Sequence, residues 1–101
     1  MTTYNYLSEM QELSFKAAMA LSVIDDIGMK DFYLAANEGF YIRLEKITNE
    51  EAEKTITQSQ LEQYLRTKDF VEQKEKEAAE ILAKDKNEPE GEKCKSQEIL
   101  Y

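Results

Sequence analysis

The chain has few side chains that could perform chemistry at neutral pH. Histidine is absent, so no side chain has an unperturbed pKa near neutrality, and Ser-His-Asp or Cys-His catalysis is excluded. The serines and threonines lack a partner that could act as their base. Zinc sites that depend on histidine are excluded on the same ground. We therefore expect a protein that is not an enzyme and has no cofactor.

Carboxylates offer one place where a cation could bind. Asp25 and Asp26 are adjacent, and Asp31 follows closely, so their oxygens could coordinate a divalent ion. Their spacing is not that of an EF-hand loop. We also expect the pair to lie at the C-terminus of a helix, where the dipole disfavours negative charge. The interpretation we favour is that these are solvated loop acids and that the chain has no metal site.

Tyrosine and arginine form the group that most suggests binding of a partner. If residues 32–44 form a hairpin, Tyr33 lies opposite Arg43, with Tyr41 diagonal to it and Glu45 on the same open face. Tyrosine and arginine are enriched where protein interfaces concentrate their binding energy. Ordinary cross-strand pairing on a solvated sheet is the alternative. We predict that Tyr33, Tyr41, Arg43 and Glu45 bind another protein, with a homodimer as one possible form.

The first element that positions these residues is a helix over residues 5–27. Its apolar residues are spaced alternately by four and three positions, which is one face of a helix: Tyr6, Met10, Leu13, Ala17, Ala20, Ile24 and Ile27. Gly28 follows at the position where a left-handed C′ residue is favoured.

The apolar pattern then changes to alternation. Residues 32–36 and 40–44 alternate, and Asn37-Glu38-Gly39 between them suits a three-residue hairpin loop. The segment 54–58 (KTITQ) reads as a short edge strand. Together these segments predict a three-stranded antiparallel sheet with one apolar face.

A second helix is predicted from Ser59 to about Lys86. Ser59 and Glu62 match the S-x-x-E capping box. The apolar spacing slips near Thr67, which leaves a break in this helix open. Residues 87–101 contain proline, glycine and alternating charges, so we predict a flexible tail after a single domain of residues 1–86. Whether Ile99-Leu100-Tyr101 is a binding segment is left open.

The predicted fold class is therefore α+β, with the order α-β-β-β-α. Both helices should cover the apolar face of the three-stranded meander, because the other face carries the tyrosines and the charged residues. The tyrosine-bearing face would then be free to bind.

Net charge restricts the partners. The chain of 101 residues has 13 basic and 21 acidic residues and a formal charge of -8, which disfavours binding to nucleic acid or to anionic lipid. The longest apolar stretch, residues 17–24, is too short for a membrane span of about 20 residues. A single cysteine, Cys94, cannot form an intrachain disulfide, and no secretory signal is evident. We expect a cytoplasmic protein.

The sequence thus predicts a small acidic protein-binding module. In size, acidity and lack of catalytic groups it resembles the accessory proteins of phages and mobile elements, some of which inhibit host or defence enzymes. The alternative is an acidic inhibitor that occupies the nucleic-acid site of a nuclease or polymerase. The acids Glu45, Glu50, Glu51 and Glu53 would serve that role, but we favour a solubilising loop, because the helix predicted after Ser59 interleaves Lys and Glu and so does not extend a surface of one sign.

Overall fold

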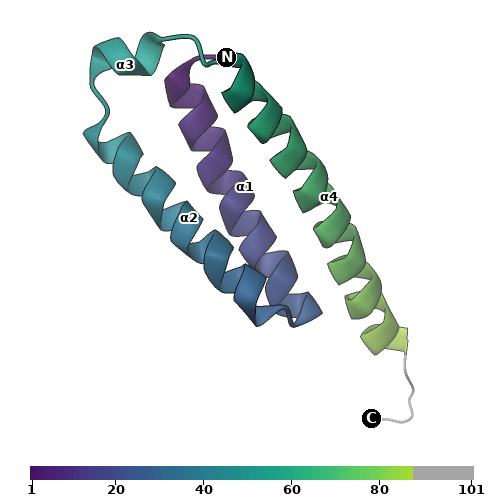
Figure 1. The fold of residues 1–101 in the computed structure, drawn as a ribbon. Helices are drawn as coiled ribbons and strands as arrows, with labels where there is room; N and C mark the ends of the chain where they lie inside the picture. Colours follow the sequence, from purple (N-terminus) through teal and green to yellow (C-terminus); the bar gives the residue numbers. More distant parts are fainter. Residues whose placement is uncertain (88–101) are drawn as a thin grey trace.

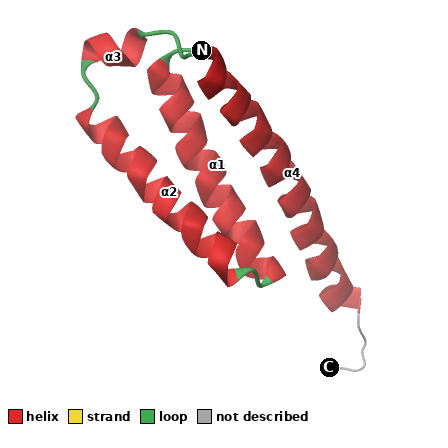
Figure 2. Ribbon diagram, in the orientation of Figure 1, coloured by secondary structure: helices red, strands yellow, loops and turns green. Residues whose placement is uncertain are grey.

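The chain folds into helices. A computed structural model describes residues 1–87, with side chains described for residues 1–84. Four helices follow one another: α1 (Thr3–Ile24), α2 (Ile27–Lys46), α3 (Asn49–Glu53) and α4 (Gln58–Asn87). Within this part of the chain there is no β-strand (Figure 2), so the predicted α+β meander is wrong.

The three long helices are arranged around α1. Along the chain, α1 and α2 run in opposite directions, and α4 then runs in the same direction as α1 (Figure 1). Helix α1 packs against α2, α3 and α4, whereas the backbones of α2 and α4 do not meet. Helix α1 is therefore the centre of the fold, and α2 and α4 are its two flanks.

The helix predicted from the four-and-three spacing is present as α1. Nine of its residues are buried: Tyr6, Leu7, Met10, Leu13, Ser14, Ala17, Ala18, Ala20 and Leu21. Leu7 and Leu21 are among the largest fully buried side chains, and Val71 of α4 joins them in the core. The alternating spacing keeps these side chains on one side of the helix, where both flanking helices can cover them.

The end of α1 differs from the prediction in its residues. Asp25, and not Gly28, has the left-handed conformation (φ 72°), and its N–H donates to the carbonyls of Leu21 and Ser22. Asp26 then caps α2, because its Oδ1 accepts a hydrogen bond from the N–H of Met29 at 3.3 Å. The second acid thus lies at a helix N-terminus, where the dipole favours negative charge.

The predicted hairpin is a single helix. Residues 32–36, 37–39 and 40–44 all lie within α2. A helical spacing is also present in this segment, since Tyr33, Ala36, Phe40, Leu44 and Ile47 recur every three or four residues and are all half-buried. Packing of these side chains against α1 therefore decided the structure, despite Gly39 in the helix interior at a cost of about 1 kcal/mol.

The predicted third strand is reduced to one bridge. Thr55 pairs with Thr2 in an isolated antiparallel β-bridge, and Gln58 already belongs to α4. The N–H of Thr3 donates to the carbonyl of Lys54 at 2.7 Å, and that of Ile56 donates to the carbonyl of Met1 at 3.1 Å. These bonds hold the start of α4 beside the start of α1.

Caps fix the two remaining helices. Thr48 and Glu51 form a capping box at the start of α3. At the start of α4 the reciprocal pair is Thr57 and Gln60, with N···O distances of 2.9 and 3.1 Å, and not the predicted Ser59 and Glu62. Helix α4 continues without a break through Thr67. The predicted tail begins at residue 87. The described residues end at Asn87, so the rest of that segment, Ile99-Leu100-Tyr101 included, lies outside them.

Candidate functional site

The four predicted partner-binding residues lie on one helix but not on one face. Tyr41 and Arg43 are two residues apart on α2, which places them about 160° apart around the helix. Tyr33 is half-buried and stacks on Phe70 of α4, with ring centroids 5.4 Å apart. Tyr41 and Glu45 are exposed. The hairpin that would have brought all four side chains together is absent, so their role in binding stays a prediction.

The two tyrosines also differ in their electrostatic surroundings. Burial raises the pKa of Tyr33 above the ordinary value of 10.0. The pKa of Tyr41 is raised chiefly by a hydrogen bond to Glu45 and further by the charge of that carboxylate. Tyr33 therefore belongs to a packed contact between helices, and Tyr41 belongs to the solvated surface of α2.

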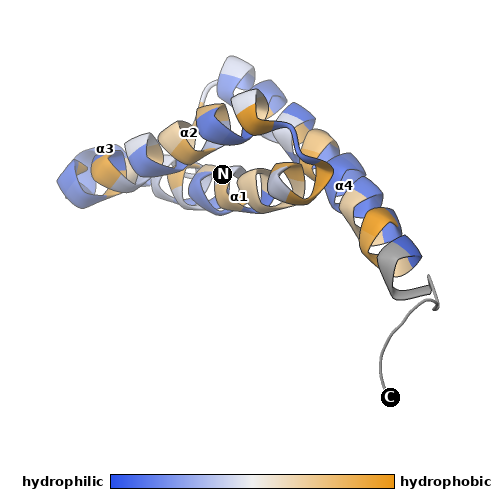
Figure 3. Cartoon of the chain, turned by 90° about the horizontal axis from the view of Figure 1, so that it is seen from below, coloured by the Kyte–Doolittle hydropathy of each residue, from blue (hydrophilic) through white to orange (hydrophobic). Residues whose placement is uncertain are grey.

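An open hollow lies between α2 and α4, and we call it the α2–α4 cleft. It has a volume of about 570 Å³. Its lining residues are Tyr33 of α2 and, from α4, Ser59, Gln63, Arg66, Thr67, Asp69, Phe70 and Gln73. Figure 3 shows the three long helices obliquely from below, with α1 and α2 in separate layers and α4 to the side of both.

Aromatic rings continue beyond the stacked pair. Phe32 lies edge-on to Tyr33 at 5.1 Å, and it is 62% exposed. Lys74 lies 5.6 Å from the centroid of the Phe70 ring, a cation–π arrangement. Arg66 and Asp69 both line the cleft, so its aromatic faces lie beside one charge of each sign.

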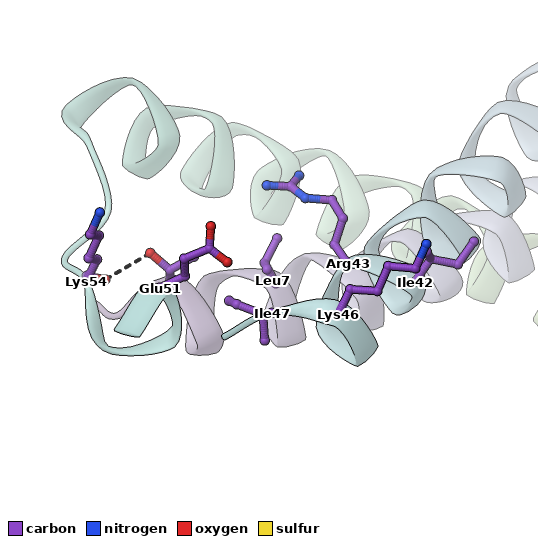
Figure 4. A pocket seen from close by; sticks show the side chains of 8 residues that line it. Leu7, Ile42, Arg43, Lys46, Ile47, Glu51 and Lys54 are labelled. Carbon is purple, nitrogen blue, oxygen red and sulfur yellow. Dashed lines mark hydrogen bonds between the residues drawn. The ribbon is translucent and has the colours of Figure 1, made fainter. Parts of the chain in front are cut away.

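A second hollow, the Arg43 pocket, lies between the N-terminal part of α1 and the C-terminal part of α2. Its volume is about 400 Å³, and it is lined by Thr3, Leu7, Ile42, Arg43, Lys46, Ile47, Glu51 and Lys54. The guanidinium of Arg43 is directed toward α4 (Figure 4). Burial raises the pKa of Tyr6, and the charge of Arg43 acts against that rise, so Arg43 lies near Tyr6. The Tyr6 hydroxyl donates a hydrogen bond to Gln63 Oε1 at 3.2 Å, and Gln63 lines the α2–α4 cleft. The two hollows are therefore neighbours.

Unpaired cations gather in these two hollows. Among residues 1–84 the ion pairs are Lys16–Glu12 and Lys74–Glu77. Neither Arg43 nor Arg66 takes part in one, and the same holds for Lys46 and Lys54. Four basic and two acidic residues line the two hollows together, so they carry a net positive charge in a chain of -8.

A third hollow, the α1–α4 groove, is apolar. It has a volume of about 330 Å³ and is lined by Phe15, Lys16, Met19, Ala20, Val23, Glu75, Ala78, Ala79 and Leu82. Phe15 and Leu82 are each 50% exposed. The groove could cover an apolar side chain of a partner, but it has few polar groups that would orient one.

No cluster suited to metal binding is found in the described part of the chain. Residues 1–84 contain no group of three or more His, Cys, Asp or Glu side chains that could hold a metal ion. Asp25 and Asp26 form the turn between α1 and α2. Within residues 1–87, none of the helices combines the length and apolarity needed to cross a bilayer.

Sequence reasoning missed Phe32, Arg66 and Phe70 as surface residues of the same region. For Arg66 and Phe70 the signal would have been the helical spacing of 66, 70 and 73 on the segment that became α4. The meander prediction instead placed Phe32 in the core.

Comparison of the chain with protein-family models, with curated proteins and with solved structures finds no match.

Proposed function

We propose that this chain is a non-enzymatic module that binds another protein through apolar side chains that its helices leave exposed. The observation that carries the proposal concerns α2, which has no buried side chain. Large apolar residues on this helix are 36% to 62% exposed: Ile27, Met29, Phe32, Leu34, Tyr41 and Ile42. Large apolar side chains that remain exposed on a helix are available for a partner to cover.

The α1–α4 groove supports the same proposal. Phe15, Met19 and Leu82 are also large, apolar and exposed. When a partner covers such side chains, the complex is stabilised by roughly 25 cal/mol per Å² of apolar surface removed from water. We further propose a cytoplasmic location and an accessory role of the kind that phages and mobile elements encode, since acidity and lack of catalytic groups are common to such proteins.

Affinity capture from the native host, with matched variants, tests the proposal. We expect the intact chain to capture a specific protein, and we expect Phe32→Ser or Phe15→Ser to weaken that complex about tenfold, as loss of a buried aromatic anchor does. Glu38→Ser is the control, because it changes an exposed residue of α2 without removing apolar surface. Equal capture by all these variants would contradict the proposal.

The salt dependence separates this function from inhibition by charge mimicry. A complex held by apolar contacts should change little between low and high salt, whereas one that replaces nucleic acid should weaken steeply. Steep weakening, with no effect of Phe32→Ser or Phe15→Ser, would favour the inhibitor of a nuclease or polymerase instead.

A further inference from the structure

The arrangement of the long helices is that of an incomplete bundle. In a closed three-helix bundle each helix packs on the other two, with axes 8–10 Å apart. Here α2 and α4 both pack on α1, but their backbones do not meet. The stacked rings of Tyr33 and Phe70 connect them. This is the relation of two diagonal helices of a four-helix bundle, each beside the same third helix, and it leaves the fourth position open.

The side chains around that position are suited to a helix. Tyr33 and Phe70 line the α2–α4 cleft, and the exposed Phe32 lies edge-on to Tyr33. From Ser59 to Gln73 the lining of α4 extends over about 21 Å, at 1.5 Å per residue. A helix of about four turns matches that length.

The charges of the same region indicate the sign of the occupant. Arg66 lies in the cleft and Arg43 in the adjoining pocket, and neither has an acidic partner among the described residues. Arginine forms bidentate bonds with carboxylates, so these two positions favour Asp or Glu on the flanks of the occupant. The two hollows together carry a net positive charge, which favours the same sign.

We infer that the α2–α4 cleft receives an acidic amphipathic helix of the partner protein, which completes a four-helix bundle on this chain. The inference rests on the proposed function and specifies its partner. The apolar face of the incoming helix covers Phe32, Tyr33 and Phe70, as in other complexes that place a helix in a groove. Its acidic flanks contact Arg43 and Arg66.

The test uses two designed helical peptides of about 15 residues. Both carry the same leucine stripe, but one has glutamate and the other lysine on its flanks. Each is titrated into the ¹⁵N-labelled chain and followed by NMR. We expect the glutamate peptide to shift the amide signals of Tyr33, Phe70 and Gln73, and to bind at least about tenfold more tightly than the lysine peptide, a difference of about 1.4 kcal/mol.

Two double variants with the same change in net charge provide the decisive comparison. Arg43→Glu with Arg66→Glu should reverse the preference and favour the lysine peptide. Lys68→Glu with Lys76→Glu alters two exposed cations of α4 that line none of the hollows described above, so the glutamate peptide should still be preferred. Circular dichroism checks that both variants keep the helical fold.

Four outcomes of the peptide experiment would overturn the inference. They are binding of neither peptide, equal binding of both, equal effects of the two double variants, and signal changes confined to Phe15, Met19 and Leu82 of the α1–α4 groove. A doubled mass in light scattering that is lost in Phe70→Ser would assign the cleft to a second copy of this chain and overturn it too. In each case, loss of native capture in Phe15→Ser would leave the proposed function standing.

Discussion

Helices α1 and α2 are nearly equal in length but differ in what they bury. Helix α1 has 22 residues, of which nine are buried, whereas α2 has 20 residues and buries none. Both contain many apolar side chains. The difference comes from spacing, because the four-and-three pattern of α1 gathers these side chains on one face. The alternation in α2 distributes them around the helix, so that α1 covers one part and leaves the rest exposed.

This contrast has a functional consequence. The side chains that hold the fold together lie on α1, and those that are free to contact a partner lie largely on α2 and on the outer surfaces of α1 and α4. Substitutions of the buried residues of α1 should therefore act on stability, and substitutions of the exposed apolar residues of α2 should act on binding.

The largest expected effect is that of truncating a leucine in α1. Leu21→Ala removes a fully buried side chain and leaves a cavity, so it should lower the free energy of unfolding by about 2–5 kcal/mol. Leu34→Ala in α2 removes the same atoms from a position that is 36% exposed, and should cost less than about 1 kcal/mol. Urea denaturation followed by circular dichroism measures both. Similar losses would show that α2 contributes as much to the core as α1 does.

Enlarging an alanine should give an intermediate effect. Ala18 of α1 is fully buried, so Ala18→Leu should force its neighbours apart and cost about 1–3 kcal/mol. Ala35 of α2 is exposed, and Ala35→Leu should change stability by no more than about 0.5 kcal/mol. Thermal unfolding of the two variants makes the comparison, and a destabilised Ala35→Leu would mean that this part of α2 is covered in solution.

The smallest effect concerns tyrosine ionisation. Glu45→Gln should return the pKa of Tyr41 toward 10.0, because Glu45 is the main cause of its upward shift. The pKa of Tyr33 should stay raised, since burial causes it. Titration of the tyrosine rings by NMR distinguishes the two residues, and a parallel fall in both values would refute the assignment of separate causes.

The same shifts set the direction of a pH effect on stability. A raised pKa in the folded state means that folding favours the neutral phenol of Tyr33. The resulting stabilisation is present below the ordinary pKa of 10.0 and is lost as pH rises through the raised value. Unfolding measured on both sides of pH 10 should show this loss, and Tyr33→Phe should reduce it.

Sequence reasoning succeeded where one periodicity was present and failed where two competed. In α1 the spacing of Tyr6, Met10 and Leu13 fits only a helix. In α2 the alternation of Phe32, Leu34 and Ala36 and the helical spacing of Tyr33, Ala36 and Phe40 are both present, and Asn37-Glu38-Gly39 favoured the hairpin. Contact with α1 settled the choice, and a single sequence does not contain that information.

The candidate site, too, was predictable only in part. Tyr33 and Arg43 were identified from their residue types, and the structure places them beside two hollows that adjoin each other. Their arrangement was not predictable, because it depends on how far α2 and α4 stand apart. Phe70 and Arg66 became visible only once α4 had a position next to α2.

The short helix α3 has an electrostatic consequence for the whole fold. Because α1 and α4 run in parallel, the positive ends of their dipoles lie together at the end of the molecule where α3 is found (Figure 1). Neither long helix has an acid in its first turn. The carboxylates of Glu50, Glu51 and Glu53 lie at this same end, where the dipoles of α1 and α4 attract negative charge and the dipole of α2, which ends there, repels it. A five-residue helix that buries no side chain thereby places three carboxylates where two positive helix ends and one negative helix end meet.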